Sequence, residues 1–560
     1  MQFIRAGYRF LSSEVSGLHA AVYVLALSAL FSSILALVRD RLLAHTFGAS
    51  ATLDVYYAAF RIPDLIFVIA GALVSVYILI PELAKRDESS QRRYIDTVIA
   101  GFSLFAVAVA LVAFAVAPEL LGRFFPRFVE SGVLGEAVLL TRILLLQPIL
   151  LGLSNILAAI TQIRSRYALY SLSPLLYNLG IILGVTLFYP MWGTAGLAWG
   201  VVLGAALHVG IQVPSVFADG FLRTIPLIRE PRALLSTVMI SIPRALALSL
   251  NQIAFLALVS MAALLPAGSI AIFIFAYNLN SVPLAIIGAS FSVAAFPTLA
   301  KALSLGERDE FISLVATATR YVFFWSVPAS FLVLVLRAHI VRVVLGSGAF
   351  DWTDTRLTAA AFALLSLSLA CQGLLLLLFR AYYAAGRTLV PLVASAGIAS
   401  LTVLLAWLGT TVFEVSVLRE SAEVFFRVEG LAGSAVLSLA IAFSIATGVG
   451  ALALVMHFET VFAGYFSLIW RGIGESILAG VVAGFSAYVF LELVSSFHVP
   501  STTLSLFVQG ALAGIFAIAM ATAAYIVLGN REYAETYTSI AARLWRKKTD
   551  EITVVASAEQ

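Results

Sequence analysis

Long apolar runs, separated by short polar clusters, fill most of this chain. The runs match the roughly 20 residues that a helix needs to cross the hydrocarbon core of a bilayer. Charged clusters separate them, for example at 85–93 and 305–310. We therefore expect about fourteen transmembrane helices. Their cores are expected near residues 19–38, 65–81, 96–117, 138–160, 168–189, 194–215, 237–263, 269–297, 316–336, 358–379, 389–409, 431–456, 473–493 and 506–528.

The pattern also repeats along the chain. Pro-Glu-Leu-Ala-Lys closes the second run at 81–85, and Pro-Thr-Leu-Ala-Lys closes the eighth at 297–301. A Pro-Leu pair recurs at 174 in the fifth run and at 391 in the eleventh. The offsets, 216 residues from 81 to 297 and 217 from 174 to 391, indicate a duplicated unit of six helices. Because six is even, both copies should have the same orientation in the membrane.

These patterns predict an all-α polytopic membrane protein built from two parallel-repeat lobes. We expect an N-lobe at 1–217 with helices one to six and a C-lobe at 218–457 with helices seven to twelve. Helices thirteen and fourteen should lie within 458–530, followed by a basic cytoplasmic tail at 531–560. Two similar lobes that rock about a central cavity are typical of transporters.

Composition excludes several other classes of protein. Hydrophobic residues make up 61% of the chain and charged residues 11%, whereas soluble proteins carry about 25% charged residues. A soluble enzyme and a nucleic-acid binder are therefore excluded. The single cysteine, Cys371, cannot form an intrachain disulfide, and we find neither a metal-binding spacing nor a phosphate-binding glycine loop. We expect a protein that is not an enzyme and has no metal or cofactor.

The distribution of basic residues predicts the orientation, because cytoplasmic loops carry an excess of Lys and Arg. If the N-terminus is inside, most basic residues fall in cytoplasmic segments, among them Lys85, Arg86, Arg229, Arg232 and the cluster from Arg543 to Lys548. Both termini are therefore expected in the cytoplasm.

Charges within the apolar runs mark candidate functional residues, since each costs about 2.5–3.5 kcal/mol to insert. The triplet Arg39-Asp40-Arg41 ends the first run, and Asp54, Tyr57, Arg61 and Asp64 follow at spacings that share one helix face. One hypothesis is a cationic wall for an anionic substrate, because guanidinium binds phosphate bidentately. The alternative is a set of charges that neutralise one another at the membrane edge.

Other polar residues lie inside later runs. Arg244 lies well inside the seventh run, unlike the charged residues that normally flank a transmembrane helix. We expect its side chain to line a cavity rather than to extend to the membrane interface. Asn278 and Asn280 in the eighth run are more typical of ties between helices. Arg142 and Arg320 are expected at membrane interfaces.

The order and spacing of several motifs resemble the MviN/MurJ family of lipid II flippases, within the multidrug/oligosaccharidyl-lipid/polysaccharide exporter superfamily. The resemblance covers most of residues 20–400. Its motifs are Val38-Arg39-Asp40-Arg41, Phe47-Gly48-Ala49, Asp54, Phe60-Arg61-Ile62-Pro63-Asp64, Gly348-Ala349-Phe350-Asp351 with Asp354-Thr355, and Arg380-Ala381-Tyr382-Tyr383-Ala384.

The resemblance implies a flippase that moves lipid II, the undecaprenyl-pyrophosphate-linked precursor of peptidoglycan, from the inner to the outer leaflet of the bacterial cytoplasmic membrane. It implies alternating access through a cationic central cavity, with a groove for the lipid tail at helices thirteen and fourteen. Arg39, Asp40, Asp54 and Arg61 match positions that are functional or basic in the family. Membrane lipids and the cell-wall synthesis machinery are the implied partners.

The chain departs from the family pattern at several positions. Ser33, Phe67 and Ala72 replace charged residues of the first two helices, Asn278 replaces an Arg of the eighth, and Arg387 replaces an acid before the eleventh. We therefore hypothesise that Arg244 supplies to the second lobe the positive charge lost at Asn278, and we count both among the substrate-binding candidates.

Four alternative functions stay open. A flippase for another polyprenyl-linked oligosaccharide would keep the cationic cavity, whereas a drug/cation antiporter should favour carboxylates there. A membrane-embedded cell-wall glycosyltransferase would need an acidic base in an outer loop, and the short loops offer little of this. A non-transporting scaffold would fit the missing arginines.

Overall fold

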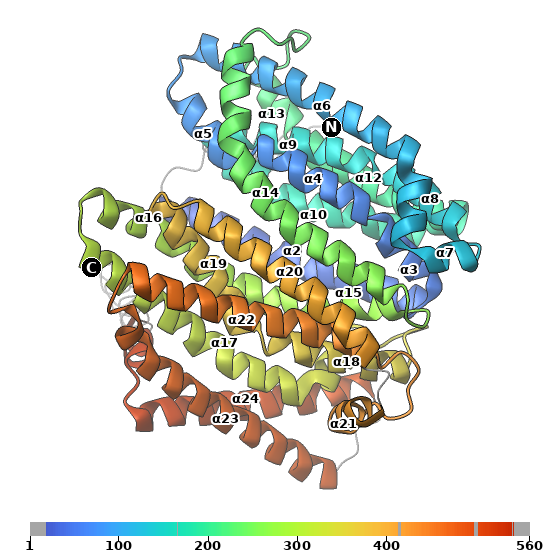
Figure 1. Cartoon of the computed structure of the whole chain (residues 1–560), viewed down its shortest axis with the longest axis vertical. Coiled ribbons are helices and arrows are strands. Elements are labelled where there is room, and N and C mark those ends of the chain that lie inside the picture. Colours follow the sequence, from blue (N-terminus) through green and yellow to red (C-terminus); the bar gives the residue numbers. More distant parts are fainter. Residues whose placement is uncertain (1–17, 165, 413–415, 498–501, 540, 542–560) are drawn as a thin grey trace, which may run out of the picture. The chain divides into compact units, whose positions relative to one another are not determined.

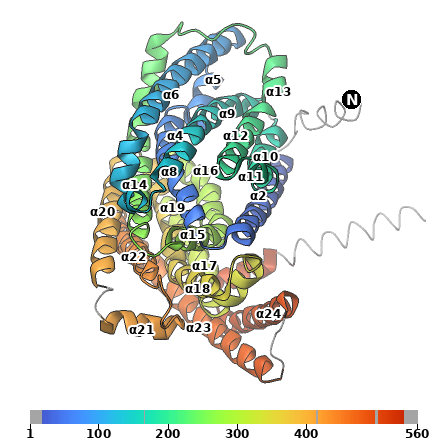
Figure 2. The same ribbon diagram turned by 90° about the vertical axis from the view of Figure 1, so that its right-hand side faces the viewer.

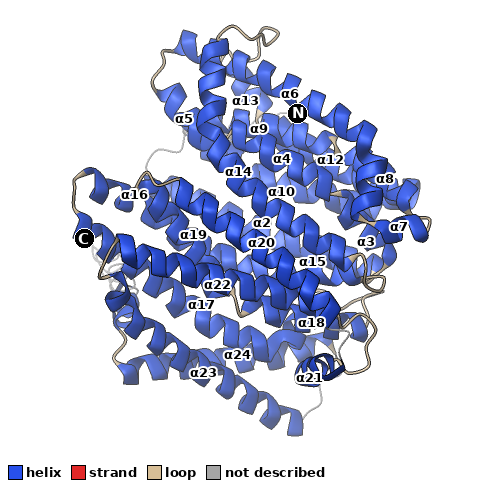
Figure 3. Cartoon of the chain, in the orientation of Figure 1, coloured by secondary structure: helices blue, strands red, loops and turns tan. Residues whose placement is uncertain are grey.

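A computed structural model describes residues 18–164, 166–412, 416–497, 502–539 and 541. These residues are almost all helical, and none of them lies in a strand (Figure 3). The predicted all-α class is therefore confirmed.

The first half of the chain forms helices α2 to α14 and one π-helical turn, η1. Their bounds are α2 Leu18–Phe47, α3 Ala51–Ala59, α4 Arg61–Leu73, α5 Val76–Ala84, α6 Glu88–Phe124, α7 Pro126–Glu130, α8 Leu134–Leu144, α9 Leu146–Ile163, α10 Tyr167–Leu183, η1 Gly184–Phe188, α11 Tyr189–Trp192, α12 Thr194–Gly210, α13 Val213–Ala218 and α14 Pro231–Ala262.

The second half forms α15 to α24 and a second π-helical turn, η2. Their bounds are α15 Ser269–Leu284, η2 Ala285–Ala289, α16 Ser290–Ser304, α17 Arg308–Val344, α18 Trp352–Ser366, α19 Leu369–Ala384, α20 Leu389–Val412, α21 Ser416–Phe426, α22 Val436–Val461, α23 Tyr465–Phe497 and α24 Thr503–Leu528.

Each predicted apolar run coincides with helical structure, which makes the chain a multi-pass membrane protein. Within the described residues, 11 helical stretches are long and apolar enough to cross a membrane, or up to 12 if the pair α18–α19, bent by 44°, counts as one span. The expected number of about fourteen spans is not confirmed.

The second predicted span is broken rather than continuous. α4 ends at Leu73 and α5 begins at Val76, and between them Ser75 has extended backbone angles (φ −64°, ψ 135°). Pro63 does not cause this break, because it lies in the first turn of α4, a position that tolerates a missing N–H. Backbone groups freed at such a break have to find partners inside the protein.

The chain divides into two compact units. Unit 1 consists of Met1–Ala276, Val344–Thr358 and Thr388–Ala446, and unit 2 of Tyr277–Val343, Ala359–Arg387 and Thr447–Gln560. The repeat-based lobes stay a prediction.

In unit 1, glycines let α10 and α12 pack backbone to backbone; Figures 1 and 2 show the two helices side by side. A Cβ added at Gly180 would lie 2.3 Å from the Cα of Gly204, and one added at Gly184 would lie 2.8 Å from the Cα of Gly200. Small residues that permit such an approach are a common basis of helix association in membranes.

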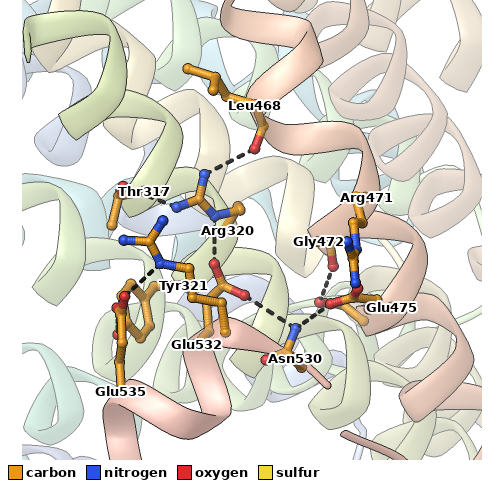
Figure 4. A network of polar contacts seen from close by, with 12 residues as sticks. Thr317, Arg320, Tyr321, Leu468, Arg471, Gly472, Glu475, Asn530, Glu532 and Glu535 are labelled. Carbon is orange, nitrogen blue, oxygen red and sulfur yellow. Dashed lines mark hydrogen bonds and ion pairs between the residues drawn. The ribbon is translucent and has the colours of Figure 1, made fainter. Parts of the chain in front are cut away.

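In unit 2, a polar network joins the segment after α24 to α17 and α23 (Figure 4). Arg320 donates to Glu532 at 2.5 Å and to the carbonyl of Leu468 at 2.9 Å. Asn530 donates to Glu475 at 2.7 Å and to Glu532 at 3.1 Å. Arg320 and Glu532 thus form a largely buried ion pair, with side-chain exposures of 13% for Arg320 and 4% for Glu532, and the position of Arg320 at a membrane interface stays a prediction.

A second contact between α17 and residues 531–539, which are helical, lies beside this pair. Tyr321 donates to Glu535 at 2.9 Å, and Arg531 donates to the same carboxylate at 2.7 Å. The hydrogen bond from Arg531 lowers the pKa of Glu535 below its ordinary value, so this carboxylate is ionised at neutral pH. The basic cluster from Arg543 to Lys548 lies outside the described residues.

Replacing Arg320 with Met should destabilise the protein by about 3–5 kcal/mol, because Glu532 would then be a buried carboxylate without its cation. The free energy of unfolding in detergent micelles measures this. The control Arg531→Met removes a pair whose Arg side chain is 74% exposed, and its effect should be about 0–1 kcal/mol. Equal losses in the two variants would contradict the assignment.

Candidate functional site

The predicted charges of the first two helices form a buried cluster inside unit 1. Arg39 on α2 donates through Nε to Asp40 Oδ1 at 2.9 Å and through Nη1 to Asn178 Oδ1 on α10 at 2.9 Å. Asp40 is only 4% exposed. Arg39 and Asp40 therefore form an internal ion pair that also ties α2 to α10.

Arg61 is also buried and its guanidinium contacts protein groups on several sides. Its Nε donates to the carbonyl of Tyr57 at 3.0 Å, and its Nη2 lies 3.4 Å from Asp64 Oδ2. The guanidinium also stacks on the ring of Phe255 from α14, at 5.1 Å from the centroid. Of the residues on the predicted polar face, Arg61 and Asp64 form an ion pair within the protein.

Asp54 caps the N-terminus of a distant helix. Its two carboxylate oxygens accept hydrogen bonds from the amides of Gly268, at 2.6 Å, and Ala271, at 2.9 Å, at the start of α15. A carboxylate is stabilised there by unpaired N–H groups and by the helix dipole. Gly268 has φ +92°, and a Cβ added to it would lie 2.1 Å from the carbonyl oxygen of Ala49, so this contact requires glycine.

A third segment completes what we call the interlock, formed by residues 45–54, 266–271 and 344–354. Asp354 accepts from the amide of Ala49 at 3.0 Å, and the amide of Ala349 donates to the carbonyl of His45 at 2.9 Å. A Cβ added at Gly348, where φ is +58°, would lie 2.3 Å from the His45 carbonyl oxygen. The motif at 47–49 therefore contacts the motif at 348–354, although about three hundred residues separate them in the sequence.

A cavity of about 510 Å³ opens in unit 1 among α4, α5, α9, α10 and α14. It is lined by Phe67, Val68, Gly71, Ser75, Ile80, Pro81, Asn155, Gln162, Tyr170, Arg244 and Leu248. Arg244 Nη1 donates to Ser75 Oγ at 3.2 Å, at the break between α4 and α5. Broken helices at a ligand site are typical of transporters.

The five candidate residues that lie in unit 1 do not form one site. Arg244 lines the cavity, whereas Arg39, Asp40, Asp54 and Arg61 are not among its described lining residues. The cavity that contains Arg244 is built from α4, α5, α9 and α10, which lie within the predicted N-lobe, together with α14, although we expected Arg244 to serve the second lobe.

The candidates of the eighth run lie in unit 2. The backbone carbonyl of Asn278 accepts from Ser281 at 2.6 Å. Asn280, 1% exposed, donates to Gln372 on α19 at 3.5 Å. Asn280 therefore ties two helices, as its position predicted. No group of three or more His, Cys, Asp or Glu side chains that could bind a metal occurs among the described residues.

Sequence reasoning missed the uncharged residues of the cavity. Ser75, Asn155, Gln162 and Tyr170 are ordinary in a transmembrane run, and no charge distinguishes them. The one available signal was the spacing of Asn155 and Gln162, which places two carboxamides seven residues apart on the same helix face.

Comparisons with known proteins agree with this architecture. The family model for the lipid II flippase MurJ matches residues 43–509. The chain is 26% identical over 378 residues to a MurJ protein of Buchnera aphidicola, covering 66% of this chain and 74% of that one. It is 24% identical over 394 residues to the lipid II flippase MurJ of Burkholderia cenocepacia, covering 67% and 74%.

A solved structure of lipid II flippase MurJ in an inward closed conformation has the same fold. It superposes with a TM-score of 0.71 at 20% identity and covers 92% of this chain and 100% of that one. With a family model that matches most of its length, this chain belongs to the MurJ family of lipid II flippases.

Proposed function

We propose that this protein moves lipid II from the inner to the outer leaflet of the bacterial cytoplasmic membrane by alternating access, with both of its termini in the cytoplasm. The observation that carries the proposal is Arg244, a guanidinium within the long helix α14 that lines a cavity together with the uncharged polar side chains of Ser75, Asn155 and Gln162. Inserting a charged side chain into a membrane costs free energy, so such residues are usually paired or functional. Pyrophosphate is a ligand that guanidinium binds well.

The positions of the cavity and the interlock support loading from the inner leaflet. In the proposed orientation, Gln162 lies at the inner end of α9 and Tyr170 near the inner start of α10. The interlock joins chain segments that follow the outer ends of α2, α14 and α17. A headgroup in the cavity would therefore face the cytoplasmic side while the outer side is held closed.

Release to the outer leaflet requires the interlock to open as the two proposed lobes, 1–217 and 218–457, rock. The amides of Gly268 and Ala271 would separate from Asp54, and the amide of Ala49 from Asp354. Net positive charge that moves with the cavity would respond to the membrane potential, at about 2.3 kcal/mol per charge per 100 mV.

The other candidate residues would contact the headgroup only after exchanging partners. Arg39 would release Asn178 and Arg61 would release Asp64, each in favour of a phosphate oxygen, with Asp40 keeping Arg39 oriented. Asn278 is a further proposed contact. Helices α23 and α24, within 458–530, would hold the prenyl tail, and enzymes that polymerise lipid II are the partners that this role implies.

Replacing Arg244 with Ala should abolish growth of a strain depleted of its own lipid II flippase, because the cavity would lose its cation. A charged hydrogen bond contributes about 1.5–3 kcal/mol, which corresponds to a loss of roughly 10- to 100-fold in flipping. Arg142→Ala is the matched control, since Arg142 donates to the carbonyl of Phe114 and stacks on its ring away from the cavity. Full growth with the Arg244→Ala variant would reject the proposal.

Replacing Asp54 with Ala should favour the outward-open state, because α15 would lose the cap that closes the interlock. The measurement is labelling of Val68→Cys, a cavity residue, by a membrane-impermeant maleimide added outside cells, in a Cys371→Ser background. Labelling should rise severalfold in the Asp54→Ala variant and remain at its starting level with Glu119→Ala, an exposed carboxylate. Unchanged labelling with Asp54→Ala would show that the interlock is not a gate.

A further inference from the structure

Two carboxamides from one helix form an uncharged wall of the cavity that contains Arg244. Asn155 and Gln162 both project from α9 and both line the cavity. Their spacing of seven residues places them on the same helix face, two turns and about 10 Å apart along the axis. A ligand that reaches both must therefore carry hydrogen-bonding groups spread over a similar length.

The protein makes little use of these amides itself. Gln162 Nε2 is buried and has no hydrogen-bond partner among the described residues. A buried donor without a partner is costly, and it calls for a ligand, a water or another explanation. Asn155 faces α4 at Gly71, where an added Cβ would lie 3.6 Å from Asn155 Nδ2. No hydrogen bond from the Asn155 carboxamide to another described residue accompanies this contact.

The chemistry of a carboxamide distinguishes among the parts of a lipid-linked sugar. A carboxamide both donates and accepts hydrogen bonds, whereas an ionised phosphate only accepts and a prenyl chain does neither. Hydroxyl and acetamido groups of a sugar both donate and accept, so they can satisfy each amide in both roles. Arg244, on the same cavity, is the group suited to the phosphate.

We propose that Asn155 and Gln162 form a subsite for the sugars of the headgroup, which recognises hydroxyl and acetamido groups while Arg244 holds the pyrophosphate. This inference rests on the proposed function and specifies it. The cavity then recognises the sugars as well as the charged pyrophosphate. A prenyl pyrophosphate without sugars should therefore bind more weakly than lipid II.

The test compares two probes, lipid II and undecaprenyl pyrophosphate, for binding to the full chain in nanodiscs. The wild-type protein should bind lipid II more tightly. Asn155→Leu combined with Gln162→Met should weaken lipid II binding about tenfold and leave the Kd for undecaprenyl pyrophosphate unchanged, because two neutral hydrogen bonds are lost. Arg244→Gln should weaken binding of both probes.

The control variant is Asn251→Leu, which removes an exposed amide of α14 and should keep the wild-type preference. The single variants Asn155→Leu and Gln162→Met, each with its melting temperature, separate loss of recognition from loss of folding. The inference is overturned if the double variant keeps the preference, if both Kd values rise equally, or if the wild type prefers neither probe. A wild-type protein that binds no lipid II would overturn the proposed function as well.

Discussion

A charge that leaves water must have a partner, and this requirement organises the described structure. Arg39 pairs with Asp40, Arg61 with Asp64, and Arg320 with Glu532, each largely buried within the protein. Asp54 instead accepts from the amides at the start of α15. Arg244 differs in its surroundings, because its side chain lines a cavity, where it donates to the hydroxyl of Ser75. This position singles it out as a group that can serve a ligand.

Glycine and broken helices are the second means by which the chain builds its site. Gly268 and Gly348 adopt positive φ and approach neighbouring carbonyl groups so closely that a Cβ would collide with them. The interlock is therefore made of backbone contacts that only these residues permit, joined by two carboxylates. The break between α4 and α5 similarly places Ser75 where it can orient Arg244. Function here depends on backbone geometry as much as on charged side chains.

Hydrophobic periodicity was sufficient to predict the helical class and the helical structure at each long apolar run, because about twenty apolar residues have one stable arrangement in lipid. It did not predict the short helices between the runs, such as α3 and α21. It could not predict the break before Ser75, since that stretch is as apolar as its neighbours. The depth of Arg244 in its run predicted a cavity side chain, but Asn155 and Gln162 carry no charge that would mark them. The pairing of Arg320 with Glu532 spans 212 residues and follows only from tertiary packing. The motifs at 47–49 and 348–354 likewise gave no sign that they meet, and the segment 268–271 carries no motif that would have marked it.

The most direct measurement of the central claim is the leaflet distribution of lipid II in cells that depend on this protein. When the protein is depleted, lipid II should accumulate in the inner leaflet and disappear from the outer one, and re-expression should restore the outer pool. If lipid II still reaches the outer leaflet and only its polymerisation stops, the protein does not transport this lipid, and the role assigned to its cavity is wrong.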